Sequence, residues 1–433
     1  MVTEKISGRW SVPASRLRND FCARAFMALI LGYPLLVLLV QGAMNTIFAL
    51  TVFLTISVLV KASRSGGVDV ELGEWTYSVA MGLLPLAIFL SDAYHSAFTA
   101  PAYDAASRFL LSGLLFIGFR RLDRAVLLQA SPGFALGTFA ALAAMLWFPG
   151  APGPRADTYF LDPIHFGDTA LILGTLSGAT IDWAAKDRLW VRALKGIALV
   201  LGVYLSIRSG SRGGWVAMPV LFGAWYYLAS KRLTARQRAM VFVTVLAVGA
   251  LAYVFDAQLQ QRVIDVWRNL VGYQKGRIDT AVGVRFKLWE AGLVLWWHNL
   301  WFGIGPRGMK MVMVPMSEFG LAAPIIAAWA RAEMHNDILA STTALGLPGL
   351  IAILAVYLAP LWVCARALKS RDSLRRKAGV AGILFVLGFA VFGLTVEVFD
   401  LSMMTAFYSM TSALLCALAA GPKTSEDDAR RPG

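Results

Sequence analysis

The chain is divided into apolar segments of about 20 residues, and this repetition limits the fold more than any other feature. A helix that crosses a bilayer needs about 20 mostly apolar residues. By this rule the sequence predicts an all-α polytopic membrane protein with about twelve transmembrane helices. Their expected positions are residues 22–41, 43–61, 74–91, 107–121, 125–148, 163–181, 191–207, 213–229, 239–255, 349–367, 377–396 and 400–420.

The composition supports this interpretation. Hydrophobic residues make up 58% of the 433 residues and charged residues 15%, whereas soluble proteins have about 45–50% and about 25%. The formal charge of +14 would suggest nucleic acid in a soluble protein. Here most Lys and Arg lie in short loops, where membrane orientation explains them, so no nucleic-acid partner is predicted. The three Cys have no metal-ligand spacing, and neither a metal nor a disulfide is expected.

The loops give the orientation. If residues 1–21 face the cytoplasm, the loops on that side are rich in Lys and Arg, whereas the opposite loops 91–107 and 149–163 are mainly acidic. This is the positive-inside pattern. It places residues 22–255 as the first group of spans, 256–348 as a large periplasmic loop, 349–420 as the last spans and 421–433 as a cytoplasmic tail. The basic residues of the inward loops include Lys61, Arg120, Arg121, Arg124, Lys186, Arg188, Lys231, Arg232, Arg371, Arg375 and Arg376.

The large outer loop breaks this charge rule. It contains Arg262, Arg268, Lys275, Arg277, Arg285, Lys287, Arg307, Lys310 and Arg331. Long loops can cross despite their charge, and a solvated basic face is the simpler explanation. Binding of an anion is the alternative, and it gains weight because Arg208 and Arg212 lie in another outward loop.

Within the loop, residues 262–271 place their apolar side chains on one helical stripe, which predicts an amphipathic helix in the membrane interface. Residues 285–301 are rich in Trp, which is typical of the headgroup level. Residues 311–330 are apolar but interrupted by Pro315, Glu318 and Pro324. The last two stretches could instead form a pair of extra spans, which would leave the orientation unchanged.

Two arginines in a glycine-rich hairpin are candidates for phosphate binding. The sequence Arg208-Ser-Gly-Ser-Arg212-Gly-Gly joins two predicted spans on the outer side. Guanidinium groups bind phosphate bidentately, and a helix N-terminus favours negative charge. Arg285 and Lys287 could add positive charge to the same pocket. The alternative is a tight turn whose arginines reach the membrane surface.

His335 is the candidate proton acceptor. It lies in Glu333-Met-His-Asn-Asp337, just before the chain re-enters the bilayer, where a neutral imidazole could take a proton from a hydroxyl. A lone His is more often structural. His165 begins a span and could face the same cavity, and Glu397 is an acid at a span end. No nucleotide-binding fingerprint is present, so no cofactor is predicted and energy must come from an activated substrate or an ion gradient.

Four groups of motifs follow one another along Pro163–Gly349. They are Pro163-x-His165-Phe-Gly167, then Ser209-Gly-Ser-Arg212-Gly-Gly, then Arg285-x3-Trp289 with Asn299-Leu-Trp-Phe-Gly-Ile-Gly305, then His335-Asn-Asp-x-Leu339 with Gly346-Leu-Pro-Gly349. Together they resemble the O-antigen ligase and polymerase superfamily of bacterial envelope glycosyltransferases, and the first is the weaker match.

The resemblance implies a metal-independent, inverting transfer of polysaccharide from undecaprenyl pyrophosphate to an acceptor, at the periplasmic face of the bacterial inner membrane. Arg212 and Arg285, with Arg208, would hold the pyrophosphate, and His335 would activate the acceptor hydroxyl. Asn336, Arg307 and His165 are candidates for supporting roles.

Within the superfamily the single large outer loop favours an O-antigen ligase, whose acceptor is a lipid A-core sugar. An O-antigen polymerase and a protein O-oligosaccharyltransferase are alternatives. Outside the superfamily, a secondary transporter or flippase and a non-catalytic lipid-binding scaffold are the rival interpretations.

Overall fold

The described part of the chain is helical, as the sequence predicts. The computed structural model describes residues 21–64, 67–150, 155–183, 185–229, 257–278, 280–306 and 333–421, with isolated positions between them. Outside the helices of this part lies an isolated β-bridge between Thr158 and Leu161. Eight of its helices are long and apolar enough to cross a membrane. The prediction of an all-α polytopic membrane protein is confirmed.

Helices occupy the predicted spans, except that the span near 239–255 lies largely outside the described residues. The elements are α2 (Phe21–Leu36), α3 (Ala43–Arg64), α4 (Leu72–Tyr94), α5 (Ala102–Phe119), α6 (Arg124–Leu127), α7 (Ala130–Trp147), α8 (Pro163–Ala179), α9 (Leu189–Ser209), α10 (Arg212–Ala229), α12 (Ala257–Gln274), α13 (Ala281–His298), α16 (Asp337–Ala367), α17 (Ser373–Gly393), η2 (Val398–Asp400) and α18 (Ser402–Ala420).

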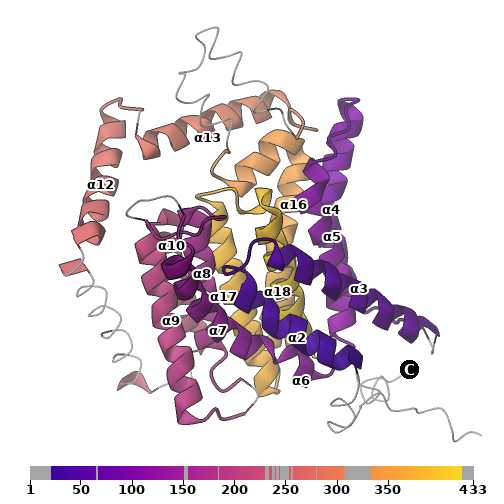
Figure 1. Ribbon diagram of the computed structural model, residues 1–433. Helices are drawn as coiled ribbons and strands as arrows, with labels where there is room; N and C mark the ends of the chain where they lie inside the picture. The colour runs from indigo at the N-terminus through magenta and orange to yellow at the C-terminus, as the bar shows by residue number, and fades with distance from the viewer. Residues whose placement is uncertain are drawn as a thin grey trace, which may run out of the picture.

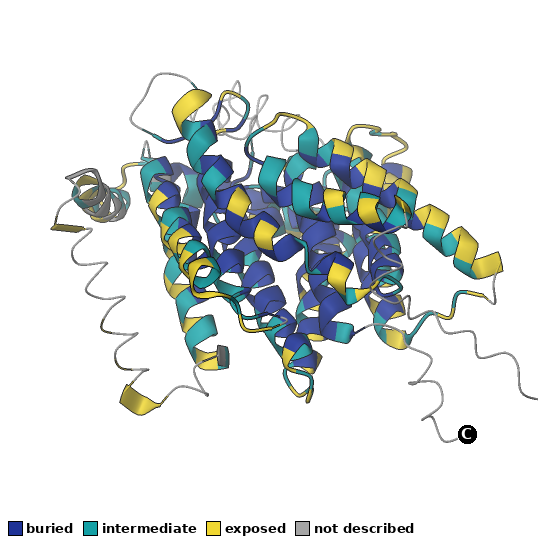
Figure 2. Ribbon diagram, turned by 60° about the horizontal axis from the view of Figure 1, so that its bottom comes forward, coloured by how far each residue is buried: buried dark blue, intermediate teal, exposed yellow. Residues whose placement is uncertain are grey.

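Helix α18 lies inside the bundle, where α3, α5, α16 and α17 pack against it, while α8 and α10 pack against α17 (Figure 1). Tyr408 of α18 is fully buried and stacks on Phe385 of α17, with ring centroids 5.4 Å apart. Figure 2 shows buried residues through the middle of the bundle and exposed ones on its outer helices. Large exposed apolar side chains such as Phe53 and Phe89 are what a surface in contact with lipid requires.

Helices α12 and α13 lie at one end of the bundle, where α13 runs across it (Figure 1). The predicted interfacial helix over 262–271 falls within α12, whose Ile264 and Trp267 are exposed. The Trp-rich stretch forms α13 up to His298. The apolar stretch 311–330 and Arg307 lie outside the described residues.

Two glycines let the chain after α13 join α16 backbone to backbone. Gly346, with φ +69° and ψ −151°, breaks the regular helix inside α16. The amide of Leu347 donates to the carbonyl of Leu300 (2.8 Å), and that of Gly305 donates to Ala344 (3.0 Å). A Cβ on Gly303 would lie 2.4 Å from the carbonyl carbon of Ala344. The motifs at 299–305 and 346–349 therefore form one interlocked unit.

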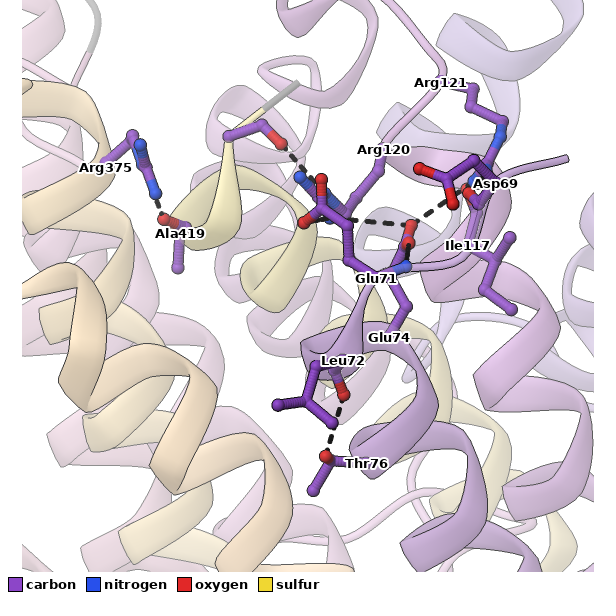
Figure 3. Close-up of polar contacts among 11 residues, drawn as sticks. Asp69, Glu71, Leu72, Glu74, Thr76, Ile117, Arg120, Arg121, Arg375 and Ala419 are labelled. Carbon is purple, nitrogen blue, oxygen red and sulfur yellow. Dashed lines mark hydrogen bonds and ion pairs between the residues drawn. The ribbon is translucent and has the colours of Figure 1, made fainter. Parts of the chain in front are cut away.

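The opposite end of the bundle is closed by ion pairs (Figure 3). Glu74 is fully buried and lies 3.3 Å from Arg121 and 3.7 Å from Arg120. Arg120 also pairs with Glu71 at 2.6 Å and donates to the carbonyl of Gly421 at 3.0 Å. These arginines therefore tie α4 and α5 to the end of α18, on the side where the charge pattern predicts the cytoplasm.

Candidate functional site

The arginine hairpin is a tight turn between α9 and α10. Gly210, at φ +65°, ends α9 in the left-handed conformation that glycine adopts without strain. The segment before α8 holds the turn from outside, because Ala156 N donates to the carbonyl of Arg208 (3.0 Å) and Arg155 Nε donates to that of Ser209 (2.7 Å). The backbone of the hairpin is thus fixed at the start of α10, where Arg212 stands.

Helix α8 packs against the same hairpin. Its buried Asp168 accepts a hydrogen bond from Ser211 Oγ at 2.6 Å. A Cβ on Gly213 would lie 2.5 Å from Thr395 Oγ1, and one on Gly214 would lie 2.2 Å from Ser206 Oγ. The glycines after Arg212 are therefore required by close packing.

Arg285 approaches the hairpin from α13. Thr280 caps this helix by accepting from Gly283 N at 3.0 Å, which places Arg285 near its start. Burial lowers the pKa of Arg285, the positive charges of Arg212 and Arg155 lower it further, and Glu333 opposes the shift. Three guanidinium groups from three segments distant in sequence thus share one region, a concentration of positive charge that is costly unless an anion joins it.

His335 lies in the short segment that leads into α16. It is buried, its φ is +55°, and its Nδ1 pairs with a carboxylate oxygen of Glu333. A residue with a side chain rarely adopts this left-handed conformation, and such strained residues cluster at functional sites.

Neighbouring contacts fix this conformation. Met334 N donates to a carboxyl oxygen of Glu397, and the carbonyl of Met334 accepts from Trp289 Nε1 at 3.2 Å. Asn336 caps α16 by accepting from Leu339 N at 3.0 Å. Since Trp289 follows Arg285 by one helical turn, α13 both carries a guanidinium group and positions the His335 segment.

Two further acids, Asp337 and Glu397, lie next to the His335 segment. Asp337 is buried and accepts from the hydroxyl of Tyr357 at 2.9 Å and from Phe399 N at 3.3 Å. Glu397 is half-buried, and burial of its carboxyl, followed by the nearby negative charges of Asp337, Asp400 and Glu333, raises its pKa to about 8. Its N–H donates to Glu333 at 3.3 Å. Glu397 is therefore protonated at neutral pH and adds no charge beside the arginines.

His165 completes the cluster from the first turn of α8. Its Nδ1 bonds Asp162 Oδ2 at 2.5 Å, and the same carboxylate caps α8 by accepting from Ile164 N at 2.8 Å. Asp168 and Glu333 both lie within electrostatic range of His165. The imidazole is thus between the hairpin support and the His335 segment.

The structure brings the main predicted residues together and adds some. Arg212, Arg285, His335 and His165 share one region through their mutual neighbours Glu333 and Arg155. Arg208 forms the last turn of α9, and Asn336 acts as a helix cap. Arg307 lies outside the described residues.

Sequence reasoning missed Arg155 and Asp168. Arg155 is the base of an otherwise acidic outer loop, and Asp168 is an acid inside an apolar span. An acid in a span is a signal for function by default, so that signal was available for Asp168.

Together these features define a polytopic helical membrane protein with a cationic cluster, flanked by buried acids and two imidazoles, at one end of the bundle. Residues 197–354 match the family model described as O-antigen ligase. An uncharacterized protein of Haemophilus influenzae is 24% identical to this chain over 300 residues, which cover 66% of the chain and 71% of the relative.

The matched region contains the hairpin, Arg285, His335 and the Gly346–Gly349 motif. This match confirms the predicted resemblance to the O-antigen ligase and polymerase superfamily over residues 197–354. The family's members are glycosyltransferase-type enzymes that act on lipid-linked glycans and membrane lipids.

Proposed function

We propose that this protein is an O-antigen ligase that transfers O-antigen polysaccharide from undecaprenyl pyrophosphate to a sugar hydroxyl of lipid A-core. The observation that carries the proposal is the position of Arg285. It lies within electrostatic range of both Arg212 and Glu333, and Glu333 pairs with His335. One region thus offers cations for a leaving group and an imidazole for a hydroxyl.

The reaction is a direct displacement at the anomeric carbon. The acceptor oxygen forms the new bond to that carbon while the bond to the pyrophosphate oxygen breaks, and the pyrophosphate leaves with the electron pair. The hydroxyl proton passes to His335. Attack opposite to the leaving group inverts the anomeric configuration. Arg212 and Arg285 stabilise the charge that develops on the pyrophosphate. Such electrostatic stabilisation of the transition state is usually the largest single contribution to catalysis.

Glu333 gives His335 its orientation. A carboxylate paired with Nδ1 keeps the proton of a neutral imidazole on that nitrogen and leaves Nε2 as the acceptor. After proton transfer, the same carboxylate stabilises the imidazolium. Glu333 therefore has the role of the acid in an acid–histidine pair, and the strained backbone at His335 aims the ring.

The proposed setting is the periplasmic side of the bacterial inner membrane. The charge pattern of the loops places α12, α13 and the His335 segment on that side. The exposed apolar side chains of α12 suit the membrane interface, where both lipid substrates present their polar groups. A single large outer loop supports a ligase over a polymerase.

The test is a transfer assay with the purified protein in liposomes that contain an undecaprenyl pyrophosphate-linked glycan and rough lipopolysaccharide. No metal or nucleotide is added. We expect a joined product with the wild type, and a loss of at least about 100-fold in rate for His335→Ala, because a positioned base contributes about 10²–10⁴-fold. Arg212→Ala should lose a similar factor.

His298→Ala and Arg268→Ala are the matched controls, since both residues are exposed and belong to α13 and α12. They should retain the wild-type rate. Normal transfer by both His335→Ala and Arg212→Ala at equal protein level would refute the proposal. Movement of the intact lipid-linked glycan across the bilayer without any joined product would favour a flippase.

A further inference from the structure

We propose that His165, as an imidazolium held by Asp162, is a further substrate-binding residue that donates its Nε2–H to an oxygen of the donor pyrophosphate. This inference rests on the proposed function and deepens it. It assigns a chemical role to the second histidine of the cluster, which the displacement reaction described above does not use.

The unsatisfied ring nitrogen carries the inference. His165 is 7% exposed, and within the described part of the chain its Nε2 is buried and has no hydrogen-bond partner. An unpaired polar atom at this depth has lost its water without gaining a partner, and this desolvation cost is larger when the group is charged. Buried polar atoms of this kind are usually paired, so a ligand atom is the natural partner of Nε2.

The other ring nitrogen determines what Nε2 can do. Nδ1 lies 2.5 Å from Asp162 Oδ2 and forms an ion pair with this carboxylate when the ring is protonated. Around the ring stand the carboxyl groups of Asp162, Asp168, Glu333 and Asp337, from the loop before α8, from α8 itself, from the His335 segment and from α16. The negative charge of Asp162, which pairs directly with Nδ1, favours the imidazolium, whose Nε2 is a donor and therefore requires an acceptor such as an anion.

The position of the ring selects the pyrophosphate rather than the acceptor hydroxyl. His165 belongs to the helix that supports the arginine hairpin: a Cβ on Gly167 would lie 1.8 Å from Ser209 Oγ, and Asp168 bonds Ser211. The hairpin ends at Arg212, so α8 and Arg212 approach a ligand as one rigid unit. The His165 imidazolium therefore adds to the positive charge of Arg212 and Arg285 around the leaving pyrophosphate, whereas the base His335 precedes α16.

The experiment measures equilibrium binding of radiolabelled undecaprenyl diphosphate to the full-length protein in lipid nanodiscs between pH 5.5 and 9. We expect His165→Gln to weaken binding about tenfold at pH 5.5, as loss of a charged hydrogen bond predicts. The ratio of the two affinities should fall toward one as the pH rises, because the wild-type imidazolium loses its proton. His298→Gln, an exposed histidine, is the control and should bind like the wild type.

Equal affinities of the wild type and His165→Gln at every pH, or a defect of constant size across the range, would overturn the inference. If His165→Gln does not fold, Asp162→Asn decides, because Asn retains the helix cap while removing the carboxylate charge. It should weaken binding in the same pH-dependent way, and normal binding would overturn the inference. A wild type that does not bind undecaprenyl diphosphate at all would instead contradict the proposed function, so the two failures are distinguishable.

Discussion

Substitution of Arg285 by Lys separates the effect of a planar guanidinium group from that of positive charge alone. It lies close enough to Arg212 and Arg155 for their repulsion to lower its pKa. We predict that Arg285→Lys retains less than about a tenth of the transfer rate, because an ammonium group cannot bind two phosphate oxygens in one plane. The rate is measured in the liposome assay, with Arg268→Lys on exposed α12 as the control. A wild-type rate for Arg285→Lys would show that charge alone is sufficient.

The raised pKa of Glu397 predicts that the stability of the folded protein depends on pH. Its pKa is about 8 in the folded protein, above the ordinary value of 4.5. The folded state therefore holds a proton that the unfolded state has lost. This stabilisation is complete below about pH 4.5 and disappears as the pH rises through 8.

We expect the melting temperature of the wild type to fall by several degrees between pH 5.5 and 9, and that of Glu397→Gln to fall less. Gln keeps the acceptor for Met334 N without the proton. Glu290→Gln, whose side chain is 59% exposed, should follow the wild type. Parallel curves for the wild type and Glu397→Gln would contradict the assignment. Thermal unfolding in detergent, followed by Trp fluorescence, gives the comparison.

At this scale the residue types with obvious chemistry could be predicted from sequence, whereas their partners could not. Arg212, Arg285 and His335 stand out because basic groups and a histidine are rare on an outer face. The pairing of Glu333 with His335 and of Ser211 with Asp168 depends on how α8, α10 and α16 meet. No local pattern contains that information.

Among the elements, the junction between residues 300–305 and α16 is the most sensitive to substitution. Gly346→Ala would place a methyl group 2.5 Å from the carbonyl of Trp301, at a φ that only glycine adopts readily. We expect a loss of about 2 kcal/mol or more in stability, and a lower transfer rate because the junction positions the start of α16. Gly196→Ala is the matched control, since its Cβ would contact nothing within 4 Å.

The control variant Gly196→Ala also has an expected effect on stability. Ala is favoured over Gly inside a helix by about 1 kcal/mol, so Gly196→Ala should leave α9 as stable or slightly more stable. The two variants are compared by thermal unfolding at one detergent concentration. A Gly346→Ala protein as stable as Gly196→Ala would show that α16 can straighten without cost.

The ion pairs that close the opposite end give a second prediction for elements. Glu74→Gln would leave Arg120 and Arg121 with one carboxylate fewer in a buried setting (Figure 3). Removing one member of a buried pair costs about 3 kcal/mol or more, and Glu71 offsets part of this through its own contact with Arg120. Unfolding temperature reports the loss. Asp104→Asn, at an ion pair in which Asp104 is 63% exposed, should change it little.

For the whole molecule, the spans and their order were predictable because apolar length is a local property. The start of α16 was not, because Asp337–Gly346 is held by contacts with Tyr357, Phe399 and the 300–305 segment rather than by its own hydropathy. The sequence places the return of the chain into the bilayer just after His335, but the predicted span at 349–367 leaves out this first part of α16. Its burial depends on elements about 50 or more residues away along the chain, such as Phe399.

The orientation of the bundle follows from its charges and can be tested directly. Arg268 on α12 and Lys369 after α16 are both exposed, and the positive-inside pattern puts them on opposite sides of the membrane. In a Cys22→Ala background, a membrane-impermeant maleimide added to spheroplasts should label Arg268→Cys and leave Lys369→Cys unlabelled until the cells are lysed. The buried Cys364 and Cys416 should remain unreactive. Labelling in the reverse order would place the arginine hairpin and His335 on the cytoplasmic side. A donor glycan presented in the periplasm could not reach them there, so the proposed ligase reaction depends on this orientation.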